Sequence, residues 1–320
     1  MHTIHDRMRD VCITTLIDGM AKDPTIFFLT ADLGSPKLDV LCQRFPDRVI
    51  NIGIAEQNLV NIAAGMALEG FKVFAYAIAP FITMRCYEQI RNNLALLSTI
   101  RPMNVTLLGV GAGLSYDVSG PTHQAMEDIS IMRTLPNIEV MSPSDTLCAR
   151  SMIDYSLNTN SVRYIRLDSK PLPHIYNQNS LIDIKTGFCE IASGTDLCIV
   201  STGYMTHKAL AALHILGQHS TKVGLIDIFI LKSFDNAKLA KILKRYKAVL
   251  TIEEAFIGKG GLDSAILHLM ATQKINASFS NIGLRDHYQF RSDARDAILE
   301  TLGLGEKAIA RRIKRYLAKR

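Results

Sequence analysis

The chain has 320 residues, of which 48% are apolar and 21% are charged, and its formal net charge is +6. This composition is ordinary for a globular protein and excludes an intrinsically disordered chain. The length allows about two domains with sizeable cores.

The sequence carries no sign of a membrane or secretory segment. No apolar run reaches the roughly 18 residues that a spanning helix needs. The first ten residues, MHTIHDRMRD, lack the apolar part of a signal peptide. Six cysteines are scattered without a C-x-x-C pair or a zinc-site spacing, so we expect reduced, mostly buried thiols, no metal site and a cytoplasmic protein. They are Cys12, Cys42, Cys86, Cys148, Cys189 and Cys198.

The positive charge is concentrated at residues 306–320, EKAIARRIKRYLAKR. Ile309, Ile313 and Leu317 recur there at helical spacing, which predicts an amphipathic helix docked through its apolar side with a solvated basic face. Binding of nucleic acid would also need a recognition motif, and we find none. We therefore expect neither a nucleic-acid nor a membrane partner. The cations are Arg311, Arg312, Lys314, Arg315, Lys319 and Arg320.

Short β-rich runs alternate with helical patterns along the first half of the chain. Near-continuous apolar strands separated by helices are typical of a parallel sheet covered on both faces. The predicted strands are 25–33, 49–53, 72–79, 104–109, 138–142 and 162–167, and the predicted helices include 8–21, 56–68 and 83–97.

A break follows at residues 169–180, SKPLPHIYNQNS, which carry two prolines and no periodicity and are typical of a linker. A second α/β pattern starts beyond it, with strands predicted at 196–203, 222–231, 248–254 and 277–284. We therefore predict two α/β domains, at residues 1–175 and 186–320.

Residues 49–70 combine a short strand, a turn at Gly53 and a helix of small and apolar residues. Glu56 stands at the start of this helix, near Ile52 and Ile54. A carboxyl among apolar neighbours is costly to ionise, which suits a group that shares a proton with a ligand nitrogen. The alternative is a glutamate that merely stabilises the positive end of the helix.

Three further candidates lie in loops after predicted strands, where ligands of α/β sheets usually bind. Asp32 is either a ligand-binding group or a turn former. The glycines of 109–113 permit close approach of a ligand, but they do not form a dinucleotide fingerprint because no helix follows directly. His123 precedes a helix and is either a neutral hydrogen-bonding group of a site or a structural histidine.

Several motifs, taken together, resemble the C-terminal half of the transketolase family in their order and spacing. This family pairs a pyrimidine-binding domain with a C-terminal domain, as do 1-deoxyxylulose-phosphate synthase and the beta chain of 2-oxo-acid dehydrogenases. The resemblance implies two doubly wound α/β domains, the first on a parallel sheet and the second smaller and on a mixed sheet. The motifs are ADL (31–33), FPDRVINIGIAEQN (45–58), AAGMALEG (63–70), YEQIRN (87–92), GPTHQAMEDI (120–129), MRTLPN (132–137), SPSD (142–145) and EE-x₄-GKGGLDSA (253–265).

The resemblance also implies roles for single residues around the cofactor thiamine diphosphate. Glu56 would act catalytically by hydrogen-bonding the aminopyrimidine ring, and Phe81 would stack on that ring. Asp32, Ile54 and Arg85 would contact the cofactor as well.

The implied substrate residues are His123, which would contact the donor beside its reacting carbonyl and count as catalytic, together with Arg9, Asp117, Ser119 and Lys170. Arg9 aligns with an arginine that binds substrate phosphate.

Some positions depart from the pattern of sugar-phosphate transketolases. Ser119 stands where an acid recognises a sugar hydroxyl, although Asp117 is close, and Gly111 stands where a histidine contacts phosphate. Ser169 falls near an expected arginine, with Lys170 beside it; a lysine neutralises phosphate as a point charge without the planar fork of arginine. These changes favour a transketolase-like transfer over the ordinary pentose-phosphate reaction.

The chain has no G-D-G motif of the kind that holds the diphosphate through a divalent metal. The resemblance therefore implies one subunit of a split transketolase that moves a two-carbon ketol unit from a ketose to an aldose. An N-terminal partner subunit would supply Mg²⁺ and the diphosphate contacts in an α₂β₂ assembly, and apolar surface would be exposed on the isolated chain. The alternatives are a 2-oxo-acid dehydrogenase beta subunit, a deoxyxylulose-phosphate-synthase-like carboligase and a non-catalytic homologue.

Overall fold

The structure is a computed structural model that describes residues 6–177 and 182–318. These residues divide into two compact units. The first comprises 6–116 and 122–177, and the second comprises 117–121 and 182–318. We describe each unit separately.

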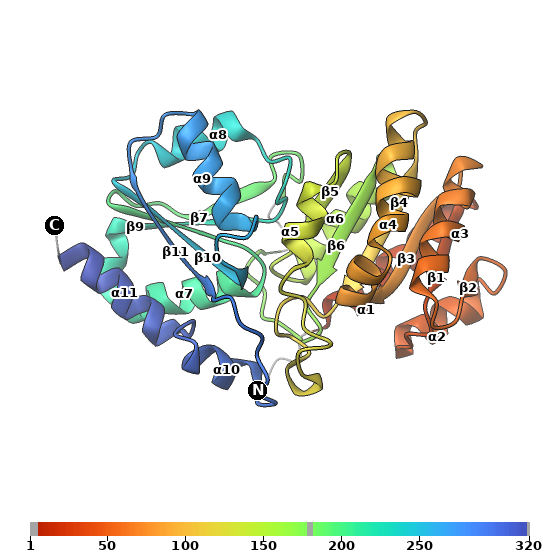
Figure 1. Cartoon of the computed structure of the whole chain (residues 1–320), viewed down its shortest axis with the longest axis horizontal. Helices are drawn as coiled ribbons and strands as arrows, with labels where there is room; N and C mark the ends of the chain where they lie inside the picture. Colours follow the sequence, from red (N-terminus) through yellow and green to blue (C-terminus); the bar gives the residue numbers. More distant parts are fainter. Residues whose placement is uncertain (1–5, 178–181, 319–320) are drawn as a thin grey trace. The chain divides into compact units, whose positions relative to one another are not determined.

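The first unit is built on a six-stranded sheet in the order β2-β1-β3-β4-β6-β5 (Figure 1). Every pair of neighbouring strands is parallel. All residues of β4 and β6 are buried, including Arg163 and Arg166 of β6. Strands buried on both faces are typical of parallel sheets. The strands are β1 (Ile26–Thr30), β2 (Val49–Asn51), β3 (Lys72–Ile78), β4 (Asn104–Val110), β5 (Ile138–Met141) and β6 (Val162–Leu167).

The helices of this unit form two groups. In the first group, α1 (Met8–Lys22) packs against α2 (Pro36–Arg44) and α6 (Thr146–Asn158). In the second, α3 (Glu56–Leu68) packs on the segment 81–99, which also contacts α5 (Asp128–Thr134). Two separate groups of helices are what a parallel sheet covered on both faces requires.

The prediction of one regular helix at 83–97 is wrong. The segment consists of a π-helix η1 (Phe81–Arg85), a short α4 (Tyr87–Gln89), a second π-helix η2 (Ile90–Leu96) and a 3₁₀ turn η3 (Leu97–Thr99). Turns of π-helix are rare and gather at functional sites. The irregular first turn carries both Phe81 and Arg85.

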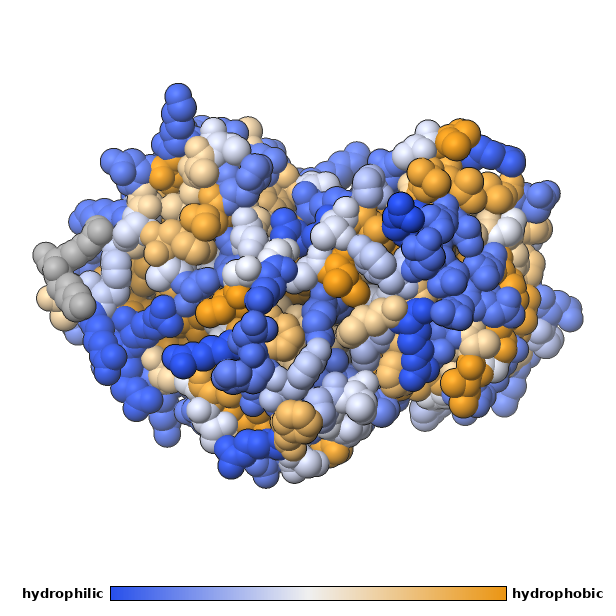
Figure 2. All heavy atoms as spheres, viewed as in Figure 1, coloured by the Kyte–Doolittle hydropathy of each residue, from blue (hydrophilic) through white to orange (hydrophobic). Residues whose placement is uncertain are grey.

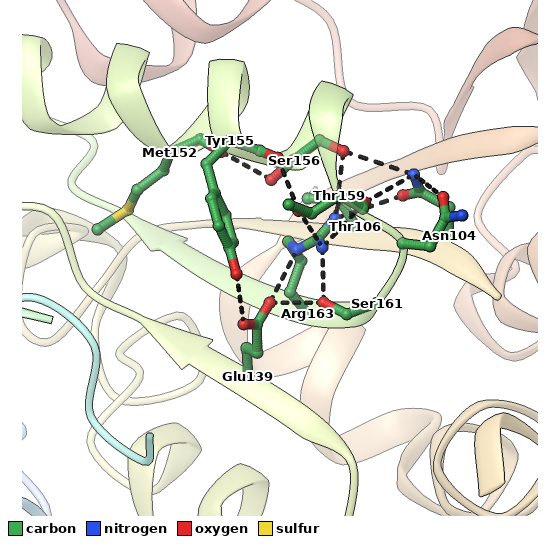
Figure 3. A network of polar contacts seen from close by, with 10 residues as sticks. Asn104, Thr106, Glu139, Met152, Tyr155, Ser156, Thr159, Ser161 and Arg163 are labelled. Carbon is green, nitrogen blue, oxygen red and sulfur yellow. Dashed lines mark hydrogen bonds and ion pairs between the residues drawn. The ribbon is translucent and has the colours of Figure 1, made fainter. Parts of the chain in front are cut away.

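A buried arginine joins the amino-terminal ends of three strands (Figure 3). Arg163 on β6 is completely buried, and its Nε donates to Oε2 of Glu139 on β5 at 3.1 Å. The other guanidinium nitrogens reach Oδ1 of Asn104 on β4 and the carbonyl of Thr159 after α6. Burial lowers the pKa of Arg163, and the charge of Glu139 acts against this effect. We call this group the Arg163 network.

The predicted linker is held to the first unit over part of its length. Oδ2 of the buried Asp145 accepts hydrogen bonds from the N–H groups of Ile175 and Tyr176 at 2.8 and 2.9 Å. Its Oδ1 caps α6 by accepting from the Cys148 N–H. Residues 178–180 of the predicted linker lie outside the described residues.

The second unit has a five-stranded sheet in the order β11-β10-β8-β9-β7. Only β7 runs antiparallel to its neighbour β9. This mixed sheet, after the parallel sheet of the first unit, confirms the predicted fold class. The strands are β7 (Phe188–Ala192), β8 (Leu197–Ser201), β9 (Val223–Ile228), β10 (Ala248–Phe256) and β11 (Ser278–Leu284).

Two helices of this unit, α7 (Tyr204–Leu216) and α11 (Glu306–Ala318), pack along each other (Figure 1). Ile309 and Ile313 are buried in α11, while its arginines are exposed, so the amphipathic terminal helix is confirmed as docked. Lys319 and Arg320 lie outside the described residues. The remaining elements are η4 (Asp117–Ser119), η5 (Gly217–Lys222), α8 (Asn236–Leu243), α9 (Leu262–Thr272) and α10 (Arg295–Thr301).

The motif at 253–265 has a structural role in this unit. Glu253 is fully buried, and its two carboxylate oxygens accept hydrogen bonds from the N–H groups of Leu262 and Asp263 at 2.7 Å each. It therefore caps the start of α9 from a neighbouring strand. A Cβ at Gly261 would overlap the Glu253 carboxylate, so the glycine is needed for this approach.

On the face drawn in Figure 2, hydrophobic residues reach the surface in groups between hydrophilic ones. Two of the exposed hydrophobic residues, Ile54 and Met84, adjoin Glu56 and Arg85 in the sequence. Among the described helices, none has both the length and the apolar character that crossing a membrane demands.

Candidate active site

Glu56 is the first residue of α3, directly after the turn that follows β2. Gly53 in this turn has a φ of 77°, which glycine adopts without strain. The Glu56 side chain is 6% exposed, and its Oε1 accepts a hydrogen bond from Nη1 of Arg85 at 3.0 Å. Within the described residues, no backbone N–H of α3 donates a hydrogen bond to this carboxylate.

The Arg85 side chain bridges Glu56 and Phe81. Its Cζ lies 3.8 Å from the centroid of the Phe81 ring, so the guanidinium covers one face of that ring. The amide Nε2 of Gln57 donates to the Arg85 carbonyl at 3.0 Å. The Arg85 side chain itself is 48% exposed. The neighbours of Glu56 in the sequence are apolar, and they do not predict this ion pair.

His123 lies beside Phe81. The two ring centroids are 5.2 Å apart with an interplanar angle of 64°, an edge-to-face contact. Nδ1 of His123 is hydrogen-bonded to the Thr122 hydroxyl at 3.0 Å, so Nε2 is the ring nitrogen left to meet a ligand.

Tyr116 extends this cluster and was missed by sequence analysis. Its ring lies edge-to-face with His123, with centroids 6.3 Å apart. Gly111, at a φ of 104°, makes room for it, because a Cβ there would overlap the Tyr116 ring. The glycine-rich loop 109–113 was the available signal, but it does not tell which side chain fills the space.

Arg9 on α1 pairs with its neighbour Asp10, with 3.3 Å between Nε and Oδ1. Burial raises the pKa of Tyr116, while the charges of Arg9 and Arg7 lower it. Arg9 has the same opposing effect on the pKa of Tyr76, which burial raises strongly. The structure joins five side chains in one run of neighbours: Glu56, Arg85, Phe81, His123 and Tyr116.

Ser169 and Lys170 follow β6 at the same sheet edge. The Ser169 hydroxyl donates to the carbonyl of Ser115 at 2.8 Å, which brings it next to Tyr116 in the chain. The Lys170 N–H donates to Oδ1 of Asp168.

Asp32 and Ile54 occupy two separate turns. Asp32 has a φ of 55°, and its Oδ1 accepts from Nδ2 of Asn51 at 3.0 Å, so it ties the ends of β1 and β2 together. Ile54 is 76% exposed, an unusual state for isoleucine.

Asp117 and Ser119 belong to the second unit. Asp117 is buried, and its Oδ2 accepts from the Arg295 N–H at 2.9 Å. The Arg295 side chain pairs with Glu254, which is also buried. Ser119 is exposed. The observed contacts of Asp117 therefore organise its own unit.

Hydrogen bonds of Ala125 hold the loop that carries His123. Ala125 exchanges two backbone hydrogen bonds with Gly113, at 2.9 and 3.0 Å. Nη2 of Arg166 on β6 donates to the Ala125 carbonyl at 3.1 Å. Gln124, between His123 and Ala125, is buried, and neither polar atom of its amide has a hydrogen-bond partner among the described residues. Such a group needs water or a ligand.

The Glu56 carboxylate and one face of the Phe81 ring contact the same planar group. This group is the Arg85 guanidinium, which donates a hydrogen bond to the carboxylate and stacks on the ring. Within 6–177 and 182–318, no three His, Cys, Asp or Glu side chains are grouped so that they could hold a metal ion.

Two family models match nearly the whole chain. The transketolase pyrimidine-binding domain matches residues 7–173, and the transketolase C-terminal domain matches residues 189–309. The chain belongs to the transketolase family.

Two of its relatives within the family are a C-terminal section and a subunit. It is 32% identical to a protein named as a transketolase C-terminal section from Methanocaldococcus jannaschii, over 99% of this chain and 98% of that protein. It is 29% identical to a subunit of the apulose-4-phosphate transketolase of Actinobacillus succinogenes, over 88% of this chain and 89% of the relative.

A solved structure of a split-gene transketolase, an inactive β4 tetramer, has 30% identity to the chain. It superposes with a TM-score of 0.86 over 98% of both chains. The predicted resemblance to C-terminal subunits of split transketolases is thus confirmed.

Proposed function

We propose that this chain is the C-terminal subunit of a split transketolase that uses thiamine diphosphate to transfer a two-carbon ketol unit from a ketose to an aldose. The carrying observation is that the buried Glu56 carboxylate and one face of the Phe81 ring hold the same planar hydrogen-bond donor, the Arg85 guanidinium, as they would hold an aminopyrimidine. The names of the relatives, which are split-transketolase sections and subunits, support the same reaction.

When bound, thiamine diphosphate supplies the nucleophilic carbon and the electron sink of the reaction. Glu56 holds a ring nitrogen of the pyrimidine, which a buried carboxyl does well because water competes little for it. Phe81 stacks on the ring, and the exposed Ile54 offers the cofactor an apolar surface. Asp32 stays a predicted cofactor contact through its position at the end of β1.

On the substrate side, Nε2 of His123 hydrogen-bonds the oxygen beside the reacting carbonyl. Arg9 and Lys170 neutralise a negatively charged end of the substrate. Asp117 and Ser119 complete the predicted substrate residues, Ser119 being exposed and able to bond a sugar hydroxyl. Because Gly111 and Ser169 replace phosphate-binding side chains, we propose a substrate other than the ordinary pentose phosphates.

The chain acts with a partner. Its sequence lacks the G-D-G motif, so the Mg²⁺ and diphosphate contacts come from an N-terminal subunit in an α₂β₂ assembly. The relatives named as subunits, and the self-associated tetramer of a similar split-gene chain, support this organisation. We propose that the complex works in the cytoplasm on small sugar substrates.

Calorimetric titration tests this function. Thiamine diphosphate with Mg²⁺ is titrated into this chain alone and into its mixture with a candidate N-terminal subunit. We expect tight binding of thiamine diphosphate in the mixture only, followed by ketol transfer from hydroxypyruvate. Tight binding to the chain alone would contradict the split site, and turnover of pyruvate instead of hydroxypyruvate would point to a 2-oxo-acid enzyme.

A further inference from the structure

We infer that the Arg85 side chain occupies the place of the aminopyrimidine ring while the cofactor is absent, so that the cofactor must displace it. Arg85 would then set the affinity for the cofactor by competition. This inference rests on the proposed function, which assigns Glu56 and Phe81 to the pyrimidine.

The Arg85 guanidinium contacts both residues that would hold the pyrimidine ring, Glu56 and Phe81. Nη1 of Arg85 lies 3.0 Å from Oε1 of Glu56, and its Cζ lies 3.8 Å from the Phe81 centroid. A stacked ring needs about the same separation from Phe81, the contact distance of carbon atoms. A pyrimidine that touches both Glu56 and this face therefore needs the volume that the guanidinium fills.

The chemistry of the two groups is also alike. A guanidinium is planar and presents N–H donors at its edge to a carboxylate. An aminopyrimidine is planar as well and offers its ring nitrogen and amino group along one edge. Each can stack on Phe81 and hydrogen-bond Glu56, but both cannot do so in one place.

The burial of Glu56 explains why its carboxylate needs another partner when the pyrimidine is not bound. Glu56 is 6% exposed, and a buried carboxylate without a partner is costly. Arg85 compensates its charge when no ligand pairs with Glu56. Because the Arg85 side chain is 48% exposed, it can return to water at little cost when a ligand arrives.

The main chain can stay in place during this exchange. Nε2 of Gln57 donates to the Arg85 carbonyl at 3.0 Å, and the Cys86 thiol next to it donates to the Ile82 carbonyl at 2.8 Å. These bonds hold the backbone of η1, so that only the side-chain torsions of Arg85 need to change.

Removal of the Arg85 side chain changes the affinity for the pyrimidine. The direction of this change distinguishes competition from a direct contact of Arg85 with the bound cofactor. If Arg85 competes, its removal raises the affinity for the pyrimidine. If Arg85 holds the bound cofactor, its removal lowers that affinity.

The experiment uses the full-length chain without a partner and two probes, thiamine and 4-amino-5-hydroxymethyl-2-methylpyrimidine. Dissociation constants are measured by ligand-observed NMR for the natural chain and for Arg85→Ala. We expect about tenfold tighter binding to Arg85→Ala, the size of a half-exposed ion pair plus a cation–π contact. Arg85→Gln, which keeps most of the side chain and removes its charge, serves as the second variant if Arg85→Ala unfolds.

Arg91→Ala is the matched control. Arg91 lies in the same irregular segment and pairs with Glu88 at 3.5 Å, away from Phe81. Its removal should leave the affinity for both probes unchanged, which separates competition for Glu56 and Phe81 from a general loss of positive charge.

Unchanged or weaker binding to both Arg85 variants, or no binding at millimolar probe, would overturn the inference. Glu56→Gln and Phe81→Ala, placed in the Arg85→Ala chain, tell which idea has failed. If they weaken probe binding while Arg85 shows the wrong sign, the proposed site stands and the competition is wrong. If they have no effect, the pyrimidine binds elsewhere and the proposed function falls with the inference.

Discussion

Nε of Arg166 donates a hydrogen bond to Oδ2 of Asp128 at 2.8 Å, and the two side chains are 4% and 0% exposed. The Tyr164 hydroxyl donates to the same carboxylate oxygen at 2.8 Å, and burial together with the charge of Asp128 raises the pKa of this tyrosine far above its usual range. Because Arg166 also holds the Ala125 carbonyl, this pair fixes the loop that presents His123.

Arg166→Met should destabilise the protein by about 3 to 5 kcal/mol, because it leaves the Asp128 carboxylate buried without its partner. Denaturant unfolding measures this loss. In the double variant Arg166→Met/Asp128→Leu, which removes both charges, much of the stability should return. A single variant that unfolds at the same denaturant concentration as the natural chain would show that the pair contributes nothing.

Glu56→Gln should lower ketol transfer by the assembled enzyme by about 10²- to 10⁴-fold, since the amide cannot exchange a proton with the pyrimidine nitrogen. Activity is measured with the N-terminal subunit under conditions in which the complex forms. Glu88→Gln is the control, because Glu88 is exposed and lies in the 81–99 segment. Full activity of Glu56→Gln would support a non-catalytic homologue.

Gly111→Ala should displace the Tyr116 ring and cost about 2 kcal/mol or more, from steric overlap and from the positive φ. Gly120→Ala separates the two causes, because Gly120 has a φ of 77° but open space around it. Gly111→Ala should therefore be the more destabilising in thermal unfolding. Equal losses in the two variants would mean that the overlap with Tyr116 has no cost.

The second unit should lose stability in acid through the cluster at Lys208. Lys208 on α7 pairs with Asp296 of α10 at 2.9 Å and with Glu306 of α11 at 3.0 Å. Burial raises the pKa of Asp296, but hydrogen bonds from Tyr204 and Lys208 outweigh it and lower the pKa. The backbone N–H of Glu306 and then Lys208 lower the pKa of Glu306.

Both carboxyls thus have lower pKa values folded than unfolded, where they are about 3.9 and 4.3. Their stabilising contribution is complete above these unfolded values and disappears as the pH falls through the folded ones. Unfolding free energy measured from pH 6 to pH 3 should fall less steeply for Lys208→Met than for the natural chain. A parallel fall in the two proteins would refute this role of Lys208.

The sequence alone was sufficient for the regular elements. Near-continuous apolar strands such as β4 and β8 are buried along their whole length, so their composition identifies them. The edge strand β7 was missed, because only Phe188 is buried and a bulge interrupts its pairing between Glu190 and Ala192. A half-exposed, irregular edge leaves no period in the sequence.

The site was predicted only in part, because some of its contacts depend on local backbone geometry. The resemblance singled out Glu56, Phe81 and His123. In the structure Arg85 contacts Glu56 and Phe81, and His123 packs against Phe81. The resemblance gave no hint that Arg85 would pair with Glu56, because this contact depends on the π-helical turn at 81–85, and π-helix has no distinctive composition. Tyr116 was missed for a similar reason, since its place is decided by the missing Cβ of Gly111.

The Arg163 network suggests where this protein tolerates change. It joins β4, β5, β6 and the end of α6 at the amino-terminal edge of the first sheet, whereas Glu56, Tyr116, Ser169 and the loop of His123 follow the carboxyl ends of the strands. Loops at the carboxyl-terminal edge of the strands could therefore be exchanged between relatives without weakening the Arg163 network at the opposite edge. The first unit is thus a suitable framework for engineering new substrate specificity.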